Sequence, residues 1–282
     1  MDASTNALAI FHFILDSFSL IQLAREFEDE FERYQIKLDI IQLRISRWGQ
    51  VSGFLNDYDN NSTVPGSVDS GANKPSPAYD TGSMEDPTQY LAKETLIAIR
   101  DTVVKAKRDA TRMRTELTPN ISQPLETETL MPPDLKGMRN RMMRILHERR
   151  VQKNKVVVGI KWAFYKREHF NTFIADVSSL TDELEKYAPA DSTERLQNIS
   201  SEECKGLNKP NLEELRDTAE GCDPWLENAV EKALTLRRSA ATYTIMQSYN
   251  TGMVTGVHHG RSDVKGISNG NNNTVNNHWA RA

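Results

Sequence analysis

An apolar seam over residues 27–49 restricts the possible folds of this chain more than any other stretch. Large apolar residues recur there at alternating steps of four and three. This spacing predicts one helix of about six turns, which Gly49 would end in a left-handed conformation. Aromatic side chains at four of the seven seam positions favour a globular helical core over a coiled coil. The seam comprises Phe27, Phe31, Tyr34, Leu38, Ile41, Ile45 and Trp48, and the residues expected to face water are Glu28, Asp29, Glu30, Arg33, Lys37, Asp39, Arg44 and Arg47.

Two long blocks carry a family resemblance. The first spans residues 31–49, contains every seam residue except Phe27 and reads FERYQIKLDIIQLRISRWG. The second spans residues 161–189 and reads KWAFYKREHFNTFIADVSSLTDELEKYAP. In this order they resemble the HeLo domain of the fungal HET-S/HET-s heterokaryon-incompatibility family. The resemblance implies an all-α, HeLo-like helical bundle over residues 1–238, followed by a separate tail over residues 239–282. The residues agree, because no alternating pattern that would build a sheet is visible.

Residues 56–87 form the longest interruption of the helical pattern. They are dense in Asn, Ser, Gly, Pro and Asp and cannot bury enough apolar surface to order themselves. We interpret them as a long disordered loop within one domain. A boundary between two domains is the alternative, but it would leave an upstream fragment too small to fold alone. Further helices are expected over residues 88–116, 134–165, 170–187, 211–220 and 224–236, with an irregular stretch over residues 196–209.

The N-terminal segment, residues 7–23, is the most apolar part of the chain, with 12 apolar residues among 17. As one helix it would reach roughly 26 Å, short of a bilayer core of about 30 Å. Asp16 near its middle would cost about 2.5–3.5 kcal/mol in lipid. The residues therefore predict a helix buried in the resting domain. The family resemblance implies a second state, in which this segment is expelled and perforates a membrane through Leu8, Ile10, Phe11, Phe13, Ile14, Leu15, Phe18, Leu20, Ile21 and Leu23.

The expected helix after Asp134 is strongly basic. Residues 134–168 hold eleven basic against three acidic residues, a local net charge of +8. A solvated face, a contact with anionic lipids and a nucleic-acid interface all remain open for it. The aromatic residues cluster at one end rather than interleaving with the basic ones, and the whole chain carries −4, so nucleic acid is not expected as a partner.

The tail changes composition after Arg238, with five glycines, seven asparagines from Asn250 onwards and no proline. Composition alone is typical of a disordered segment. Short β-favouring pieces between the glycines, and asparagines that can stack in register, also suit cross-β structure. The resemblance implies an amyloid motif that a receptor templates, here with a single glycine-spaced copy. Its residues would be Gly252, Val254, Gly256, Val257, Gly260, Val264, Gly266, Ile267, Gly270, Asn271, Asn272, Asn273, Val275 and Trp279.

Nothing in the sequence predicts an enzyme, a metal site or a cofactor. Phosphate-binding, zinc-protease and nucleophile-elbow motifs are absent. Cys204 and Cys222 have no zinc or CxxC spacing, and the adjacent His258 and His259 would point to opposite faces of an extended segment. The first residues lack a signal peptide's basic start, so a reducing, cytoplasmic setting is expected at rest.

These features together predict an effector rather than a catalyst. We expect a membrane-permeabilising cell-death protein of heterokaryon incompatibility that moves to the plasma membrane when its tail is templated. Expected partners are further copies of the chain, a nucleotide-binding receptor with a matching motif, and membrane lipids. A non-toxic prion partner and a soluble helical adaptor are the alternatives, and a salt-sensitive nucleic-acid-binding module is a third.

Overall fold

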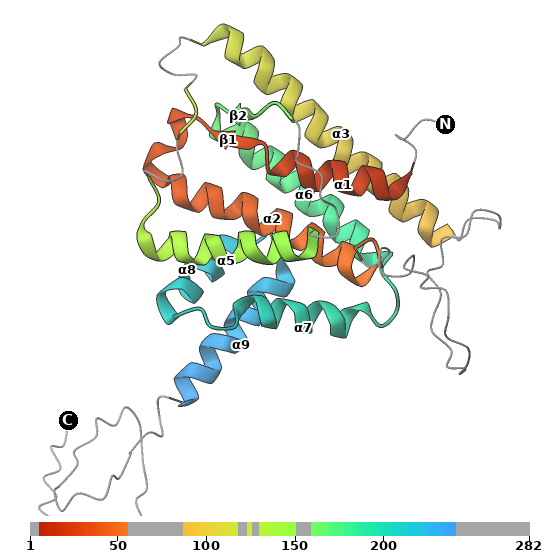
Figure 1. Cartoon of the computed structure of the whole chain (residues 1–282), viewed down its shortest axis with the longest axis vertical. Coiled ribbons are helices and arrows are strands. Elements are labelled where there is room, and N and C mark those ends of the chain that lie inside the picture. Colours follow the sequence, from red (N-terminus) through yellow and green to blue (C-terminus); the bar gives the residue numbers. More distant parts are fainter. Residues whose placement is uncertain (1–5, 56–86, 118–122, 126–129, 151–158, 241–282) are drawn as a thin grey trace, which may run out of the picture. The chain divides into compact units, whose positions relative to one another are not determined.

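The computed structural model describes residues 6–55, 87–117, 123–125, 130–150 and 159–240. Its elements confirm the all-α expectation (Figure 1). Contacts divide the chain into two units, Met1–Leu234 and Thr235–Ala282, and the core lies in the first. The elements are α1 (Ala7–Phe18), β1 (Ile21–Leu23), a 3-10 helix (Arg25–Glu30), α2 (Phe31–Val51), α3 (Pro87–Glu116), α5 (Pro133–Arg150), β2 (Trp162–Phe164), α6 (Arg167–Lys186), α7 (Ser192–Cys204), α8 (Lys209–Ala219) and α9 (Pro224–Ala240).

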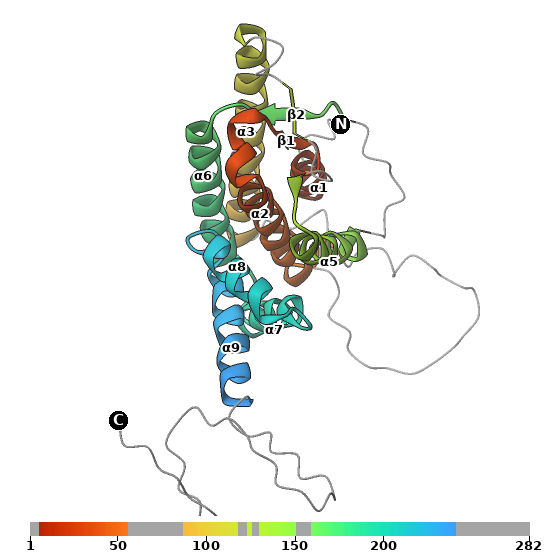
Figure 2. The same ribbon diagram turned by 90° about the vertical axis from the view of Figure 1, so that its left-hand side faces the viewer.

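Helix α2 is the centre of this bundle. It contacts α1, α5, α6, α7 and α8, and it lies between α5 and α6 in Figure 2. The predicted seam is confirmed as core, with Tyr34 half-buried and the other six residues buried. Burial extends around the whole helix, however, and includes 16 of its 21 residues. The prediction that Asp39, Arg44 and Arg47 face water is therefore wrong, because α2 has neighbours on every side.

Both ends of α2 also differ from the sequence prediction. Residues 25–30 form a 3-10 helix that precedes α2 rather than its first turns. Gly49 does not end the helix, which continues to Val51. The left-handed conformation occurs instead at Gly53, with φ of 85°, where a residue without Cβ avoids strain. Gly49 has a packing role that is described below.

The N-terminal segment is a helix followed by a strand, not one helix to Leu23. Helix α1 ends at Phe18, and β1 then pairs in parallel with β2, placing Ile21 opposite Trp162 and Leu23 opposite Phe164. The Trp162 amide donates to the Leu20 carbonyl at 3.1 Å, which extends this ladder by one bond. Neither strand shows in the hydrophobic periodicity of the sequence, because three residues are too few to show alternation.

Three other expectations can be checked in the bundle. Helices α3, α6, α8 and α9 confirm the elements predicted near those positions. The helix expected over 134–165 is described only to Arg150, and its supposed end is the strand β2, so that prediction is wrong. The stretch expected to be irregular over residues 196–209 overlaps α7, so that prediction is wrong for residues 196–204. Of the loop expected over residues 56–87, all but Pro87, which begins α3, lies outside the described residues, as does the tail expected over residues 239–282 beyond residue 240.

Candidate functional site

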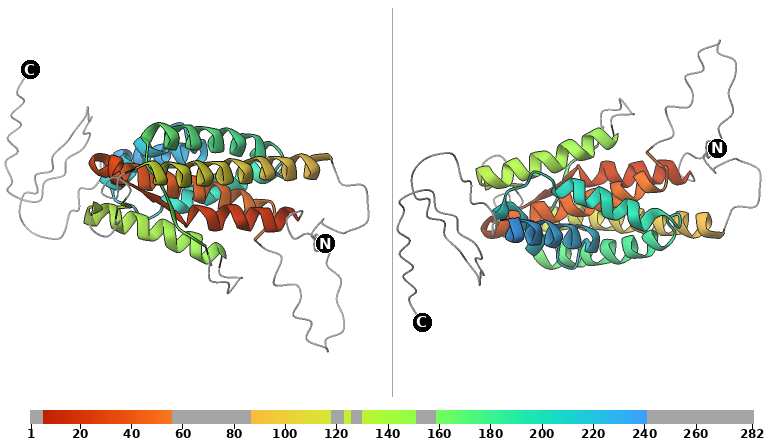
Figure 3. Two further views of the ribbon diagram at one scale, coloured as in Figure 1. Left: turned by 90° about the horizontal axis from the view of Figure 1, so that it is seen from above. Right: turned by 90° about the horizontal axis from the view of Figure 1, so that it is seen from below.

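Helix α1 is held in the bundle by side-chain packing. It runs beside α3, which in turn runs beside α6 (Figure 3). At the centre of the contact with α2, the Phe11 ring lies 5.4 Å from the Phe54 ring and 6.0 Å from the Trp48 ring, measured between centroids. Phe18 reaches Phe173 of α6 at 5.7 Å. The apolar face of α1 thus continues the core of the bundle.

Gly49 allows this close approach. A Cβ atom built on it would lie 2.1 Å from Cζ of Phe11, far inside van der Waals contact. A side chain at this position would therefore push α1 away from α2. The glycine that the sequence pattern suggested as a helix stop is needed instead for helix–helix packing.

Hydrogen bonds from Gln42 of α2 join the C-terminal end of α1 to the central helix. The side-chain amide of Gln42 donates to the Leu15 carbonyl at 2.8 Å and to the Ser19 hydroxyl at 3.0 Å. The Asn6 side chain accepts from the Leu8 amide at 2.9 Å and caps the first turn. Apolar contacts add to these bonds, because six residues of α1 are buried against the bundle.

The ten residues expected to insert into lipid are placed as follows. Phe13 is 44% exposed, and Leu8 and Leu20 are half-buried. The rest are buried in the core, namely Ile10, Phe11, Ile14, Leu15, Phe18, Ile21 and Leu23. The resting domain hides most of this surface. The fourteen residues expected to form an amyloid motif, from Gly252 to Trp279, lie outside the described residues.

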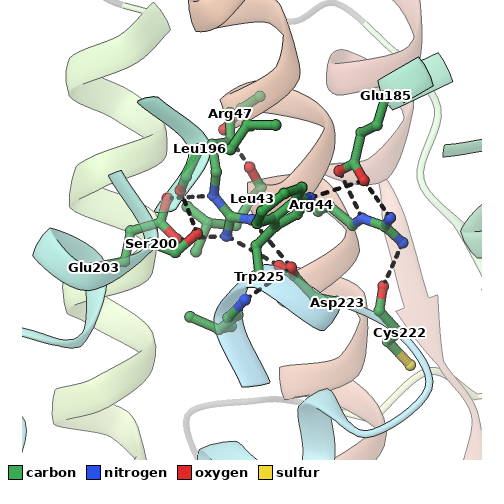
Figure 4. A network of polar contacts seen from close by, with 12 residues as sticks. Leu43, Arg44, Arg47, Glu185, Leu196, Ser200, Glu203, Cys222, Asp223 and Trp225 are labelled. Carbon is green, nitrogen blue, oxygen red and sulfur yellow. Dashed lines mark hydrogen bonds and ion pairs between the residues drawn. The ribbon is translucent and has the colours of Figure 1, made fainter. Parts of the chain in front are cut away.

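A buried network of charges fixes the other side of α2 (Figure 4). Arg47 is fully buried and donates to Glu203 of α7 at 2.6 Å and to Asp223, just before α9, at 3.0 Å. Arg44 donates to Glu185 of α6 at 2.6 Å and to the Cys222 carbonyl at 2.9 Å. Two arginines one helical turn apart therefore tie α2 to α6, α7 and the turn that leads into α9.

The charges in this network are mutually compensated. Burial lowers the pKa of Arg47, but the carboxylates of Asp223 and Glu203 outweigh it and raise the pKa overall. Burial likewise lowers the pKa of Arg44, but the bonds to Glu185 and the other nearby carboxylates outweigh this effect and raise the pKa overall. Both guanidiniums stay charged at any pH at which the domain folds. No local pattern indicates these partners, because they lie more than 130 residues away in the sequence.

Three arginines of helix α5 donate hydrogen bonds to α2 and α7. Arg139 donates to Asp39 at 2.8 Å, and Arg149 donates to Glu203 at 2.6 Å and to the Ser46 hydroxyl at 2.9 Å. Arg141 donates to the Glu202 carbonyl at 3.1 Å. Much of the positive charge that the sequence placed on this helix therefore serves to attach it to α2 and α7.

Metal ligands, reactive thiols and membrane spans are further features that a functional site could contain. Within the described ranges, no group of three His, Cys, Asp or Glu side chains could hold a metal ion. Cys204 and Cys222 are free thiols but buried, and burial raises the pKa of Cys204 to about 12. No helix among the described residues is long and apolar enough to cross a membrane. The bundle packs the apolar helix α1 against the central helix α2, which carries buried charges.

Helix α2 carries the first of the two sequence blocks and packs against α6, which carries most of the second. The model of the HeLo family, described as "Prion-inhibition and propagation", matches residues 3–220. The chain therefore belongs to the HeLo family. This membership confirms the resemblance seen in the seam and in the second block.

The chain is similar to two curated proteins of Podospora anserina. Heterokaryon incompatibility protein s is 25% identical over 233 residues, which cover 81% of this chain and 72% of that protein. Heterokaryon incompatibility protein S is 24% identical over 226 residues, which cover 80% of this chain and 70% of that protein. A solved double mutant of the HET-s N-terminal domain superposes with a TM-score of 0.69 at 23% identity, over 82% of this chain and 99% of that one. The HET-S N-terminal domain superposes with a TM-score of 0.69 at 22% identity, over 82% of this chain and 94% of that one. Both solved domains share this fold.

Proposed function

We propose that this protein is a cell-death effector of fungal heterokaryon incompatibility that permeabilises membranes when its tail is templated. The observation that carries this proposal is the storage of α1. Seven of the ten apolar side chains between Leu8 and Leu23 are buried, so the resting bundle stores most of the apolar surface that would enter a bilayer. A helix has no unsatisfied backbone groups along its length, so it can leave the bundle for lipid as a unit.

Insertion requires more than α1 itself. Its 12 residues reach about 18 Å, which is well short of a bilayer core of about 30 Å. Extending the helix to Leu23 adds the residues of β1, so the ladder between β1 and β2 has to break first. Insertion of residues 7–23 therefore requires two events, the departure of α1 from the bundle and the breaking of the ladder between β1 and β2.

The trigger in this proposal is the tail over residues 239–282. A receptor carrying a matching motif, such as a nucleotide-binding protein, templates the tail into cross-β structure, and further copies of the chain stack on it. Stacking crowds the helical domains together and favours release of residues 7–23. The protein is cytoplasmic at rest and reaches the plasma membrane on activation.

The test measures dye release from vesicles by the full chain after tail assembly is seeded. Deleting residues 250–282 should abolish both assembly and dye release while leaving a folded helical domain. Phe13→Asp should leave assembly intact and stop release, because an exposed position tolerates charge at rest but adds about 3–4 kcal/mol to insertion. Tyr90→Asp on α3, at a residue that is 51% exposed, is the matched control and should release dye like the wild type.

Either of two results would contradict this function. A chain without residues 250–282 that still releases dye fully would exclude activation by the tail. Release by Phe13→Asp at the wild-type rate would exclude α1 as the inserting segment.

A non-toxic prion partner is the second candidate, and Asp16 favours it. This acidic residue lies half-buried near the C-terminal end of α1 and in the middle of residues 7–23, where it would oppose insertion. Glu26 adds a second restraint, because its carboxylate accepts from the Arg167 amide at 2.8 Å and pairs with Lys166 at 3.1 Å, next to β2. Seeded assembly of the full chain without dye release would support this candidate, or an adaptor if assembly also fails.

A further inference from the structure

The solvent-facing side of α3 carries a cluster of cations that we call the α3 basic face, consisting of Lys107, Arg108 and Arg112. The three side chains are exposed and lie at helical spacing on one side of the C-terminal half of α3. They line a shallow depression together with Val104, Thr111 and Thr115. Val104 is 46% exposed, so the cations surround an apolar spot.

These cations are not compensated by the fold. In the part of the chain that the structure describes, no ion pair joins Lys107, Arg108 or Arg112 to a carboxylate. Arg100, earlier in the same helix, pairs with Asp101 at 2.8 Å, and the arginines of α5 bond to α2 and α7. Several basic residues of α5 thus bond within the bundle, whereas Lys107, Arg108 and Arg112 of α3 face water.

We infer that the α3 basic face binds the surface of an anionic phospholipid bilayer. Charge complementarity selects this partner, because a bilayer surface offers many phosphates to three cations on one helix face, and the exposed Val104 side chain suits the boundary between headgroups and acyl chains. Single-stranded nucleic acid fits less well, because no aromatic side chain lines the depression and bases would have nothing to stack on.

This inference rests on the proposed function and names its lipid class. Helix α1 packs directly against α3 (Figure 2). Docking through α3 would therefore hold the stored apolar helix close to the bilayer before it is released. The basic helix α5, which the sequence suggested for lipid contact, has several of its arginines bonded within the fold.

The experiment measures binding of the full, unseeded chain to vesicles by co-sedimentation, with neutral phosphatidylcholine vesicles against vesicles that also contain phosphatidylserine. The triple variant Lys107→Gln, Arg108→Gln, Arg112→Gln should lose roughly fivefold in affinity per cation and up to about 100-fold in all, and only for the anionic vesicles. Raising the salt concentration should weaken wild-type binding in the same way.

A matched control removes the same charge elsewhere. Lys186→Gln, Lys205→Gln, Lys209→Gln also changes the net charge by −3, at side chains that are 65%, 72% and 60% exposed and paired with carboxylates. It should bind like the wild type. An equal loss in both triple variants, equal binding to neutral vesicles, or tighter binding to duplex DNA than to anionic vesicles would overturn the inference.

Seeded dye release separates this inference from the proposed function. Binding through the α3 basic face without any dye release by the seeded wild type would refute the function and keep the docking surface. Full dye release with equal binding by all variants would refute the docking surface and keep the function. Circular dichroism of each variant verifies that the exposed substitutions leave the helical domain folded.

Discussion

At the scale of single residues, Arg47 stabilises the folded domain by neutralising two buried carboxylates. It is completely buried with Glu203 and Asp223, which are 5% and 0% exposed. Arg47→Leu would leave these acids buried with one cation fewer, so we expect the free energy of unfolding to fall by about 3–5 kcal/mol. Urea unfolding followed by circular dichroism measures this loss.

A surface pair gives the control for that substitution. Lys205 and Glu202 lie 3.2 Å apart, but their side chains are about 70% exposed. Lys205→Met should cost less than about 1 kcal/mol, because water already screens the pair. A comparable loss in both variants would mean that the buried network is no more important than a surface contact.

Asp39 makes the stability of the domain depend on pH. Burial raises the pKa of this carboxyl to about 6, although Arg139 and Gln35 oppose the shift. The folded state therefore holds the proton more tightly than the unfolded chain does, and the contribution to stability is present at low pH and lost as pH rises from about 4 through 6. The full change is about 3 kcal/mol, from 1.36 kcal/mol per pKa unit.

Asp39→Asn should remove this dependence. The amide keeps the shape of the carboxyl and does not titrate, so the stability of the wild type relative to Asp39→Asn should decrease between pH 4 and pH 7. Thermal unfolding of both proteins across that range measures the difference. Parallel curves would show that Asp39 does not titrate between those pH values.

At the scale of elements, the contact between α1 and α2 depends on Gly49. Alanine is normally the better helix former by about 1 kcal/mol, but its Cβ would collide here with the Phe11 ring. Gly49→Ala should therefore loosen α1 and increase hydrogen exchange over residues 7–18. Gly137→Ala in α5 is the matched control, since open space surrounds that glycine, and it should leave α1 protected. Unchanged exchange in Gly49→Ala would contradict the packing role.

The sequence contained part of the evidence for the central position of α2. Ile36, Ile40 and Leu43 lie off the seam, and all three are buried. Apolar residues on every side of a helix indicate complete burial, so the pattern could have shown that the charges between them are buried as well. Helix α7 gave no such signal. Its buried face includes the polar residues Ser200 and Glu203, and only the distant arginines Arg47 and Arg149 explain Glu203.

At the scale of the whole molecule, local patterns predicted the fold but not the long-range polar contacts. The helices and their apolar faces follow from spacing within about 20 residues, and the N-terminal helix of the candidate site was found in this way. The ion pairs of Arg44 and Arg47, the pairing of β1 with β2 and the role of Gly49 each depend on residues that are distant in sequence or on packed geometry. Periodicity carries no information about such partners.

The pairing of β1 with β2 has a consequence for the newly made chain. Ile21 and its partner Trp162 are about 140 residues apart. At about 5–20 residues per second, the ribosome needs roughly 7 to 28 s between the two. Helix α2 emerges soon after α1 and can cover Phe11, but α3 and β2 arrive only later. A nascent chain therefore exposes its most apolar segment for seconds before the fold can store it, and chaperones that act during synthesis would meet this segment in every copy.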